Sequence, residues 1–287
     1  MCLSKRHWTK SLRYVRIFFL CLLGACALPG QTSTETPAHF YDLGSRQFAN
    51  RQFAEAKQSF SRAIELNHLY GDAYRGLGLA DLELKDYEGA YHAWLKAVEL
   101  NSKDEKSKYC LGRLFYDADL PEQAAVWLRQ ALELAPGDYK AATYLGLCAE
   151  ALGLDETARQ LYRGAIADSE AQKEPYSWAF LSLGNYYKKH GDGKQAIAVL
   201  QQGASKCPEA HELTALGEML APSEPQHAEE LLRKAIALDP ALSHAHYRLA
   251  LLLQSTGRTA EARAEMVRFQ ETKKQEGQAP KITALRK

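Results

Sequence analysis

The chain has 287 residues, of which 46% are hydrophobic and 25% are charged, and this composition excludes a disordered, collagen-like or multi-span membrane protein. Its 36 Lys and Arg residues nearly balance 35 Asp and Glu residues, so the net charge of +1 gives no sign of a nucleic-acid-binding protein. Residues 1–25 hold five of the basic residues and no acidic one, so without this segment 31 basic residues face 35 acidic ones. The rest of the chain is therefore mildly acidic.

The first predicted element is a secretory leader. Its basic residues are followed by an uncharged run at residues 17–28 that ends in small residues, which is the pattern of a signal peptide. The run is too short to cross a bilayer comfortably, because crossing takes about 20 apolar residues. The alternative is an uncleaved N-terminal anchor.

The end of this run, Leu23-Gly24-Ala25-Cys26, resembles a bacterial lipobox. The resemblance implies that residues 1–26 form a signal peptide and that Cys26 is lipidated, which is the one membrane contact we predict besides an uncleaved leader. Ordinary cleavage that discards Cys26 is the alternative. Residues 27–36 are rich in Ser, Thr and Pro and are predicted to be a tether. The protein is expected to be exported to the periplasm or anchored by lipid to the cell envelope.

Three cysteines, Cys110, Cys148 and Cys207, lie beyond the leader. They are far apart and form no Cys-x-x-Cys pair, so the sequence predicts neither a disulfide framework nor a zinc site. A single disulfide between two of them is left open.

A repeated pattern fills the rest of the chain. A Leu-Gly pair recurs with its glycine at Gly44, Gly78, Gly112 and Gly146, each 34 residues after the last. An alanine follows each glycine by twelve residues, and a large apolar residue follows that alanine by four. Such spacings place these side chains on one face of a helix. We therefore predict pairs of antiparallel helices that cross closely at the small residues.

This pattern resembles the tetratricopeptide repeat, a 34-residue helix-turn-helix unit. The second unit matches best, with Tyr74, Leu77, Gly78, Tyr87, Ala90, Trp94 and Ala97. The resemblance implies an all-α fold, a right-handed α-solenoid of such units. The units are predicted at residues 37–70, 71–104, 105–138, 139–172, 177–210, 211–242 and 243–276.

Two irregularities interrupt the repeat. Four extra residues, 173–176, separate the fourth and fifth units, and the sixth unit is two residues short and has a Pro-rich turn. The sixth unit is therefore predicted to be the weak joint of the solenoid. Residues 277–287 are predicted to be a flexible basic tail.

No catalytic, metal-binding or cofactor-binding site is predicted. His244 and His246 are two residues apart on a helix, so they point in different directions and are expected at the surface. Residues 191–194 suggest a phosphate loop, but Lys188 and Gln195 stand where that motif needs Gly and Ser or Thr. The repeats leave no segment that could build a separate active site. The protein is predicted not to be an enzyme.

The resemblance also implies a binding surface, because the first helix of each unit lines the concave side in this family. Arg75 and Arg113, beside tyrosines, suggest a preference for acidic or carboxylate-bearing segments. The alternative is that these residues are simply solvated. The set that chaperone-binding members use to clamp a carboxylate is absent, because Asp42 and Gly76 replace its asparagines. The family positions also give Glu150 and Trp178. The predicted groove consists of Tyr41, Arg75, Tyr109, Arg113, Tyr116, Thr143, Asn185, Lys188 and Tyr247.

The sequence therefore predicts a non-catalytic scaffold in the bacterial cell envelope that binds a peptide segment or helix of a partner protein, and no nucleic acid. A structural assembly factor that acts by self-association or by capping a larger complex is the alternative.

Overall fold

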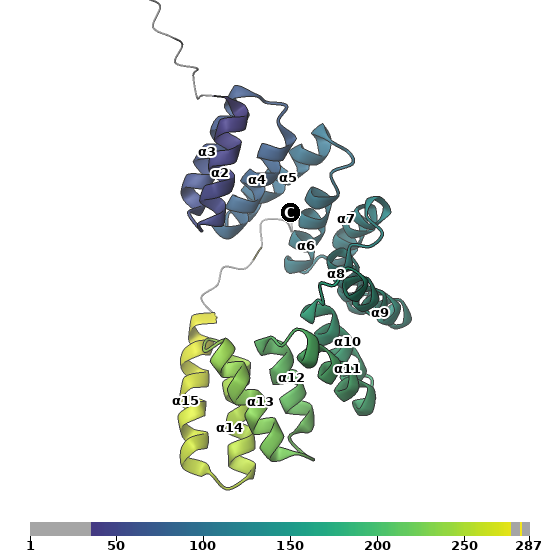
Figure 1. The fold of residues 1–287 in the computed structure, drawn as a ribbon, viewed down its shortest axis with the longest axis vertical. Coiled ribbons are helices and arrows are strands. Elements are labelled where there is room, and N and C mark those ends of the chain that lie inside the picture. Colours follow the sequence, from purple (N-terminus) through teal and green to yellow (C-terminus); the bar gives the residue numbers. More distant parts are fainter. Residues whose placement is uncertain (1–35, 277–281, 283–287) are drawn as a thin grey trace, which may run out of the picture.

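A computed structural model describes residues 36–276 and Ile282 of the chain. The predicted leader with Cys26, almost all of the tether and the predicted tail other than Ile282 lie outside these residues. The described part is entirely helical, and its fourteen helices form seven antiparallel pairs (Figure 1). The predicted all-α class of paired helices is confirmed. The helices are α2 (Pro37–Ala49), α3 (Phe53–Leu66), α4 (Gly71–Glu83), α5 (Tyr87–Leu100), α6 (Glu105–Asp117), α7 (Pro121–Leu134), α8 (Tyr139–Ala151), α9 (Asp155–Ala171), α10 (Ser177–Lys189), α11 (Gly193–Lys206), α12 (Ala210–Leu220), α13 (Pro225–Leu238), α14 (Ser243–Ser255) and α15 (Thr259–Glu276).

The pairs follow one another in an arc whose two ends are α2–α5 and α12–α15 (Figure 1). Each second helix packs against the first helix of the next pair, and the first helices of neighbouring pairs also pack against each other. The α4/α6 joint is the exception, because these two first helices barely touch. Among the described helices, none is long and apolar enough to cross a membrane.

The repeated glycines lie where the two helices of a pair cross. A Cβ atom on Gly146 would lie 2.5 Å from Cε1 of Tyr162, and one on Gly112 would lie 2.5 Å from Cγ of Leu128. Tyr162 and Leu128 are fully buried, so a large side chain of the second helix fills the space that the missing Cβ leaves. The small residues that the sequence pattern placed at the crossings therefore have a steric cause.

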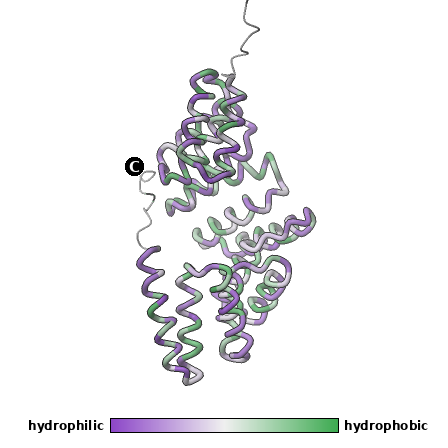
Figure 2. Tube along the Cα trace, turned by 60° about the vertical axis from the view of Figure 1, so that its left-hand side comes forward, coloured by the Kyte–Doolittle hydropathy of each residue, from purple (hydrophilic) through white to green (hydrophobic). Residues whose placement is uncertain are grey.

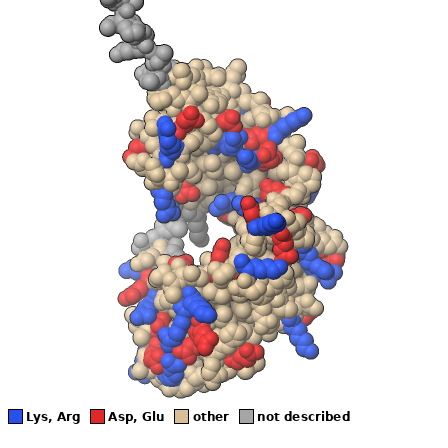
Figure 3. All heavy atoms as spheres, viewed as in Figure 1, with Lys and Arg blue, Asp and Glu red and all other residues tan. Residues whose placement is uncertain are grey.

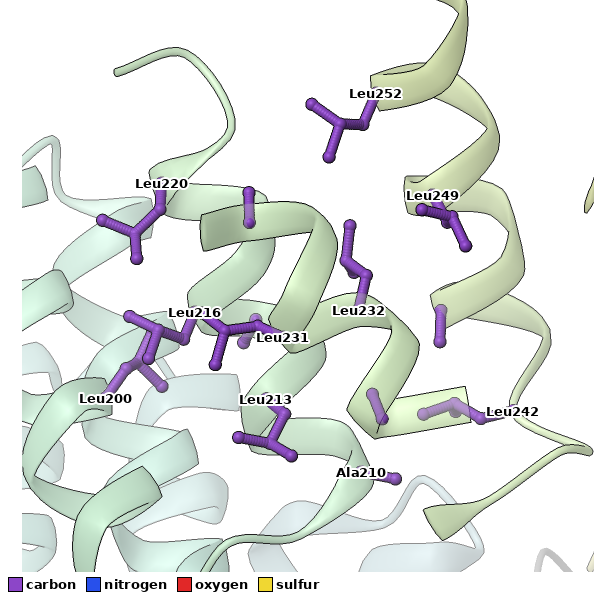
Figure 4. Close-up of a cluster of buried hydrophobic side chains, with 14 of the residues drawn as sticks. Leu200, Ala210, Leu213, Leu216, Leu220, Leu231, Leu232, Leu242, Leu249 and Leu252 are labelled. Atoms are coloured by element: carbon purple, nitrogen blue, oxygen red, sulfur yellow. The ribbon is translucent and has the colours of Figure 1, made fainter. Parts of the chain in front are cut away.

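Alternating apolar and polar residues run along most helices (Figure 2). The apolar sides meet in a series of clusters, the largest of which joins α10 to α15 through leucines and alanines (Figure 4). Leu200, Leu232, Leu249 and Leu253 in this cluster are at most 1% exposed. Because each cluster spans neighbouring pairs, each pair buries its apolar face only with the help of the next one.

The joint between the fifth and sixth pairs holds a buried carboxyl group. Glu212 in α12 is 0% exposed, and its Oε2 accepts a hydrogen bond of 3.2 Å from Ser177 Oγ, whereas its buried Oε1 has no hydrogen-bond partner. Gly203 lies against this group, and a Cβ atom there would overlap Oε1. Five other pairs have alanine at the position of Gly203. Burial raises the pKa of Glu212 to about 8, so the carboxyl group is neutral over most of the physiological range.

The helix crossings give the first prediction. Gly146→Ala should destabilise the protein by about 1–3 kcal/mol, because the new methyl group has to push Tyr162 aside. Gly164→Ala in α9 is the matched control, since a Cβ atom there meets nothing within 4 Å and alanine is the better helix former by about 0.5–1 kcal/mol. Urea unfolding of both variants measures the difference. Equal effects of the two changes would contradict the steric account.

Glu212 gives the second prediction. Its pKa rises from the ordinary 4.5 in the unfolded chain to about 8 in the folded one, so folding favours the protonated form. The stabilisation of the folded state by this proton is fully present below about pH 4.5 and is lost as the pH rises to about 8. Glu212→Gln should therefore be more stable than the wild type by roughly 2–4 kcal/mol at pH 8, with a smaller difference at pH 5.

Urea unfolding at pH 5 and pH 8 measures this effect. Glu230→Gln, a change at an exposed residue of α13, should keep the pH dependence of the wild type. A wild-type pH dependence in Glu212→Gln would contradict the role of the buried carboxyl group.

Candidate binding surface

The first helices form a continuous row from α8 to α14, with α6 joined to α8, and we call the side of this row that lines the arc the inner surface. On the face of the molecule that Figure 3 shows, basic and acidic side chains are interspersed, so no field of one sign dominates this view. Three groups of residues distinguish the inner surface: a tyrosine cluster, a cavity and a network of charges.

The tyrosine cluster consists of Tyr109 and Tyr116 in α6 and Tyr144 in α8. The Tyr144 ring meets Tyr109 and Tyr116 edge to face, with centroid distances of 6.0 Å and 5.7 Å. The Arg113 guanidinium lies 6.0 Å from the Tyr144 ring, and its Nε is 3.6 Å from Oδ2 of Asp117. Burial raises the pKa of all three tyrosines, so their hydroxyl groups stay neutral. The cluster offers aromatic edges beside one cation.

A cavity of about 310 Å³ lies beside this cluster, between α6, α8 and α10. Tyr116, Leu147 and Leu181 supply much of its apolar wall, and Asn185 and Lys189 supply polar groups. The indole Nε1 of Trp178, which also lines the cavity, is buried and has no hydrogen-bond partner. Because this nitrogen is buried, it is not accessible from the cavity, and the polar groups that the cavity offers include those of Asn185 and Lys189.

The charge network is centred on Glu218 in α12. Its carboxylate oxygens lie 2.7 Å from Lys188 Nζ, 2.6 Å from Arg248 Nη2 and 3.7 Å from His244 Nε2. Burial alone would raise the pKa of Glu218, but hydrogen bonds from His244 and Lys188 and the nearby positive charges lower it to about 2. Glu218 is therefore ionised and links α10, α12 and α14. Lys188, which the sequence analysis placed in the groove, already pairs with Glu218 of the same chain.

Arg75 has a similar structural role. Its Nη1 donates a hydrogen bond of 3.1 Å to Oδ2 of Asp104, whose side chain is 5% exposed, and its Nη2 contacts Asp72. Asp104 also accepts from the backbone N–H and the hydroxyl group of Ser107 at the start of α6. The prediction that Arg75 awaits an acidic partner is therefore corrected: its carboxylates come from its own α4 and from the residue that begins the next pair.

Thr143 requires a second correction. It is 0% exposed, and its hydroxyl group donates a hydrogen bond of 2.7 Å to the Tyr139 carbonyl, so it does not face a partner. His246, expected at the surface, is 3% exposed, with Nδ1 2.7 Å from Glu265 Oε2 and Nε2 3.1 Å from the Pro240 carbonyl oxygen. It fastens α14 to α15. Cys110, Cys148 and Cys207 are free thiols.

The structure brings some predicted groove residues together and separates others. Tyr109, Arg113 and Tyr116 share the tyrosine cluster, and Tyr116 and Asn185 share the cavity. Tyr41 packs on Phe60 and Tyr70 in the first pair, and Tyr247 packs on Phe269 in the last pair, far from both. Sequence reasoning missed Tyr144, Leu147, Leu181 and Glu218. Tyr144 directly follows the predicted Thr143, so a shift of one residue in the fourth unit would have found it.

Comparison with known proteins agrees with the fold. Residues 41–105 and 109–173 match the family described as tetratricopeptide repeat. Superkiller complex protein 3 of Mus musculus is 28% identical over 231 residues, which are 77% of this chain but only 15% of that protein. The chain thus spans a small part of that curated relative.

Two solved structures share the fold at low sequence identity. The structure of the APC/C hetero-tetramer Cut9-Hcn1 has a TM-score of 0.67 and 20% identity, covering 85% of this chain and 46% of that one. A tetratricopeptide repeat protein from Parabacteroides merdae has a TM-score of 0.63 and 18% identity, covering 85% of this chain and 96% of that one. At such identities these likenesses concern the fold alone.

Proposed function

We propose that the chain, whose residues 41–105 and 109–173 match the tetratricopeptide repeat family, is a non-catalytic scaffold that binds an extended segment or a helix of a partner protein on its inner surface. The observation that carries this proposal is the cavity between α6, α8 and α10, whose wall combines Tyr116, Leu147 and Leu181 with the amide of Asn185. A row of first helices with an aromatic hollow presents contact area without rearrangement, which favours recognition of a partner.

The chemistry of the cavity indicates what it would bind. An apolar side chain of the partner would enter between Tyr116, Leu147 and Leu181. Asn185 is exposed at the same cavity and offers an amide to the backbone of the partner. The charged residues nearby contribute less to affinity, because Lys188 and Lys189 already pair with Glu218 and Glu150. We therefore expect a partner segment whose anchor is apolar rather than acidic.

The setting is part of the same proposal. The basic leader and the lipobox-like residues 23–26 support export to the bacterial cell envelope, with lipid on Cys26.

One prediction tests binding at the cavity. Asn185→Trp should fill the cavity mouth and reduce partner recovery at least about tenfold in a crosslinked pull-down, which corresponds to about 1.4 kcal/mol. Lys234→Trp, at an exposed residue of α13, is the matched control because it adds the same ring away from the inner surface. This variant should keep partner recovery within about twofold of the wild type. Identical partner recovery for the wild type and Asn185→Trp would refute the proposal.

A second prediction tests the setting. The intact mass of the mature wild-type protein should show loss of the leader and gain of lipid, and the protein should fractionate with membranes. Cys26→Ala should lose the lipid mass and leave the membrane fraction. If neither protein carried the added mass of a lipid and both were found in the same fraction, lipid on Cys26 would be ruled out.

A further inference from the structure

The sixth pair, which the sequence marks as two residues short, has a shortened first helix. Among the described helices, the other six first helices each have 13 residues, whereas α12 has 11. The small crossing residue is the eighth residue in all seven, and in α12 it is Gly217. It is therefore the carboxyl end of α12 that lacks two residues. At this end the chain turns through Ala221 and Pro222 toward α13.

A cavity of about 290 Å³ lies at this shortened end, and we call it the α12 cavity. Ala221 and Pro222 of the turn and Leu251 of α14 contribute apolar groups to its wall. Leu251 is 37% exposed, whereas its neighbours Ala250 and Leu252 are at most 4% exposed. The loss of the last two residues of α12 thus coincides with a hollow that is partly apolar and open to a ligand.

The α12 cavity belongs to the same row of first helices as the cavity between α6, α8 and α10. The residue that follows the crossing residue is Leu147 in α8, Asn185 in α10, Glu218 in α12 and Leu251 in α14. Because these four helices pack against one another in sequence, the four side chains follow one another along the inner surface. The first two line the cavity between α6, α8 and α10, and the last two line the α12 cavity.

We propose that the α12 cavity is a second binding site for the partner segment, which places one apolar side chain in each of the two cavities. This inference rests on the proposed function, because the first cavity has to hold one part of the segment. The volumes of the two cavities are similar, at about 310 Å³ and about 290 Å³. Two helix-to-helix steps of about 8–10 Å separate them, and an extended chain rises about 3.3 Å per residue. The two apolar residues should therefore lie about six positions apart.

The charges between the cavities indicate what the middle of the segment carries. Lys188 of α10 and Arg248 of α14 share the single carboxylate of Glu218, at distances of 2.7 Å and 2.6 Å. These three side chains together carry one net positive charge. An acidic residue between the two apolar ones is therefore favoured over a basic one, and the preference should decrease at high salt. The partner that fits this surface is an extended segment with an apolar residue at each end and an acidic residue between them.

Peptide selection tests this chemistry. Random linear peptides displayed on phage are selected against the full-length protein, and the most enriched peptide is labelled and titrated by fluorescence anisotropy. We expect this peptide to contain two apolar residues about six positions apart, and replacement of either one by alanine should weaken binding at least about tenfold. If no peptide is enriched, or if the peptide binds through a single apolar residue, the proposal is overturned.

A variant of the protein tests the second cavity itself. Ser255→Trp, at an exposed residue of α14 that lines the α12 cavity, should fill it and weaken binding of the peptide at least about tenfold. Ser205→Trp in α11 is the matched control, because both serines are exposed and both hydroxyl groups donate to the carbonyl oxygen three residues earlier. This control should bind within about twofold of the wild type. Wild-type affinity of Ser255→Trp would overturn the proposal.

The two proposals fail separately. If Asn185→Trp weakens binding of the peptide and Ser255→Trp does not, the second site is wrong and the first cavity remains. If Ser255→Trp weakens binding and Asn185→Trp does not, the first cavity is wrong and the α12 cavity remains a binding site.

Sedimentation of the wild type and Ser255→Trp tests the other possible occupant, a second copy of this chain. We expect both proteins to sediment as the same monomer. A wild-type dimer that Ser255→Trp dissociates would assign the α12 cavity to self-association and overturn the proposal.

Discussion

A helix crossing with no room for a Cβ atom is the contact on which the whole solenoid depends. At Gly112 and Gly146 the backbone of a first helix lies directly against Leu128 or Tyr162 of the second. The side chain that fills this space is fully buried, so the crossing angle and the separation of the two helices in a pair are fixed. From Gly44 to Gly146 this contact repeats every 34 residues, and the arc follows from the repetition of helix pairs.

The residues of the first helices that are not used to hold neighbouring pairs together determine what the inner surface can bind. The charged residues of the first helices mostly fasten neighbouring pairs: Arg75 binds Asp104, Lys189 binds Glu150, and Lys188 binds Glu218. What is left for a partner is aromatic and apolar, namely the tyrosine cluster and the cavity beside Trp178. Recognition on this surface thus depends on shape and apolar contact more than on charge.

The sequence was sufficient for the helix pairs because the small and large residues that set them recur at fixed spacings along one chain segment. Arg75 was misassigned because its partner Asp104 is the residue that begins the next pair. The position of Arg75 within its own repeat does not predict a contact with a residue of the following repeat. Thr143 was misassigned because the same repeat position is half-buried in the third pair, at Tyr109, and fully buried in the fourth.

The central claim is that the first helices bind a partner while the second helices hold the framework. Site-specific photocrosslinking tests it most directly, with a photoreactive amino acid placed at Asn185 or Gln254 on first helices and at Arg129 or Lys234 on second helices, all of which are exposed. The account predicts that partner adducts form from the two first-helix positions and not from the two second-helix positions. Adducts of equal yield from both sets, or from the second helices alone, would contradict it.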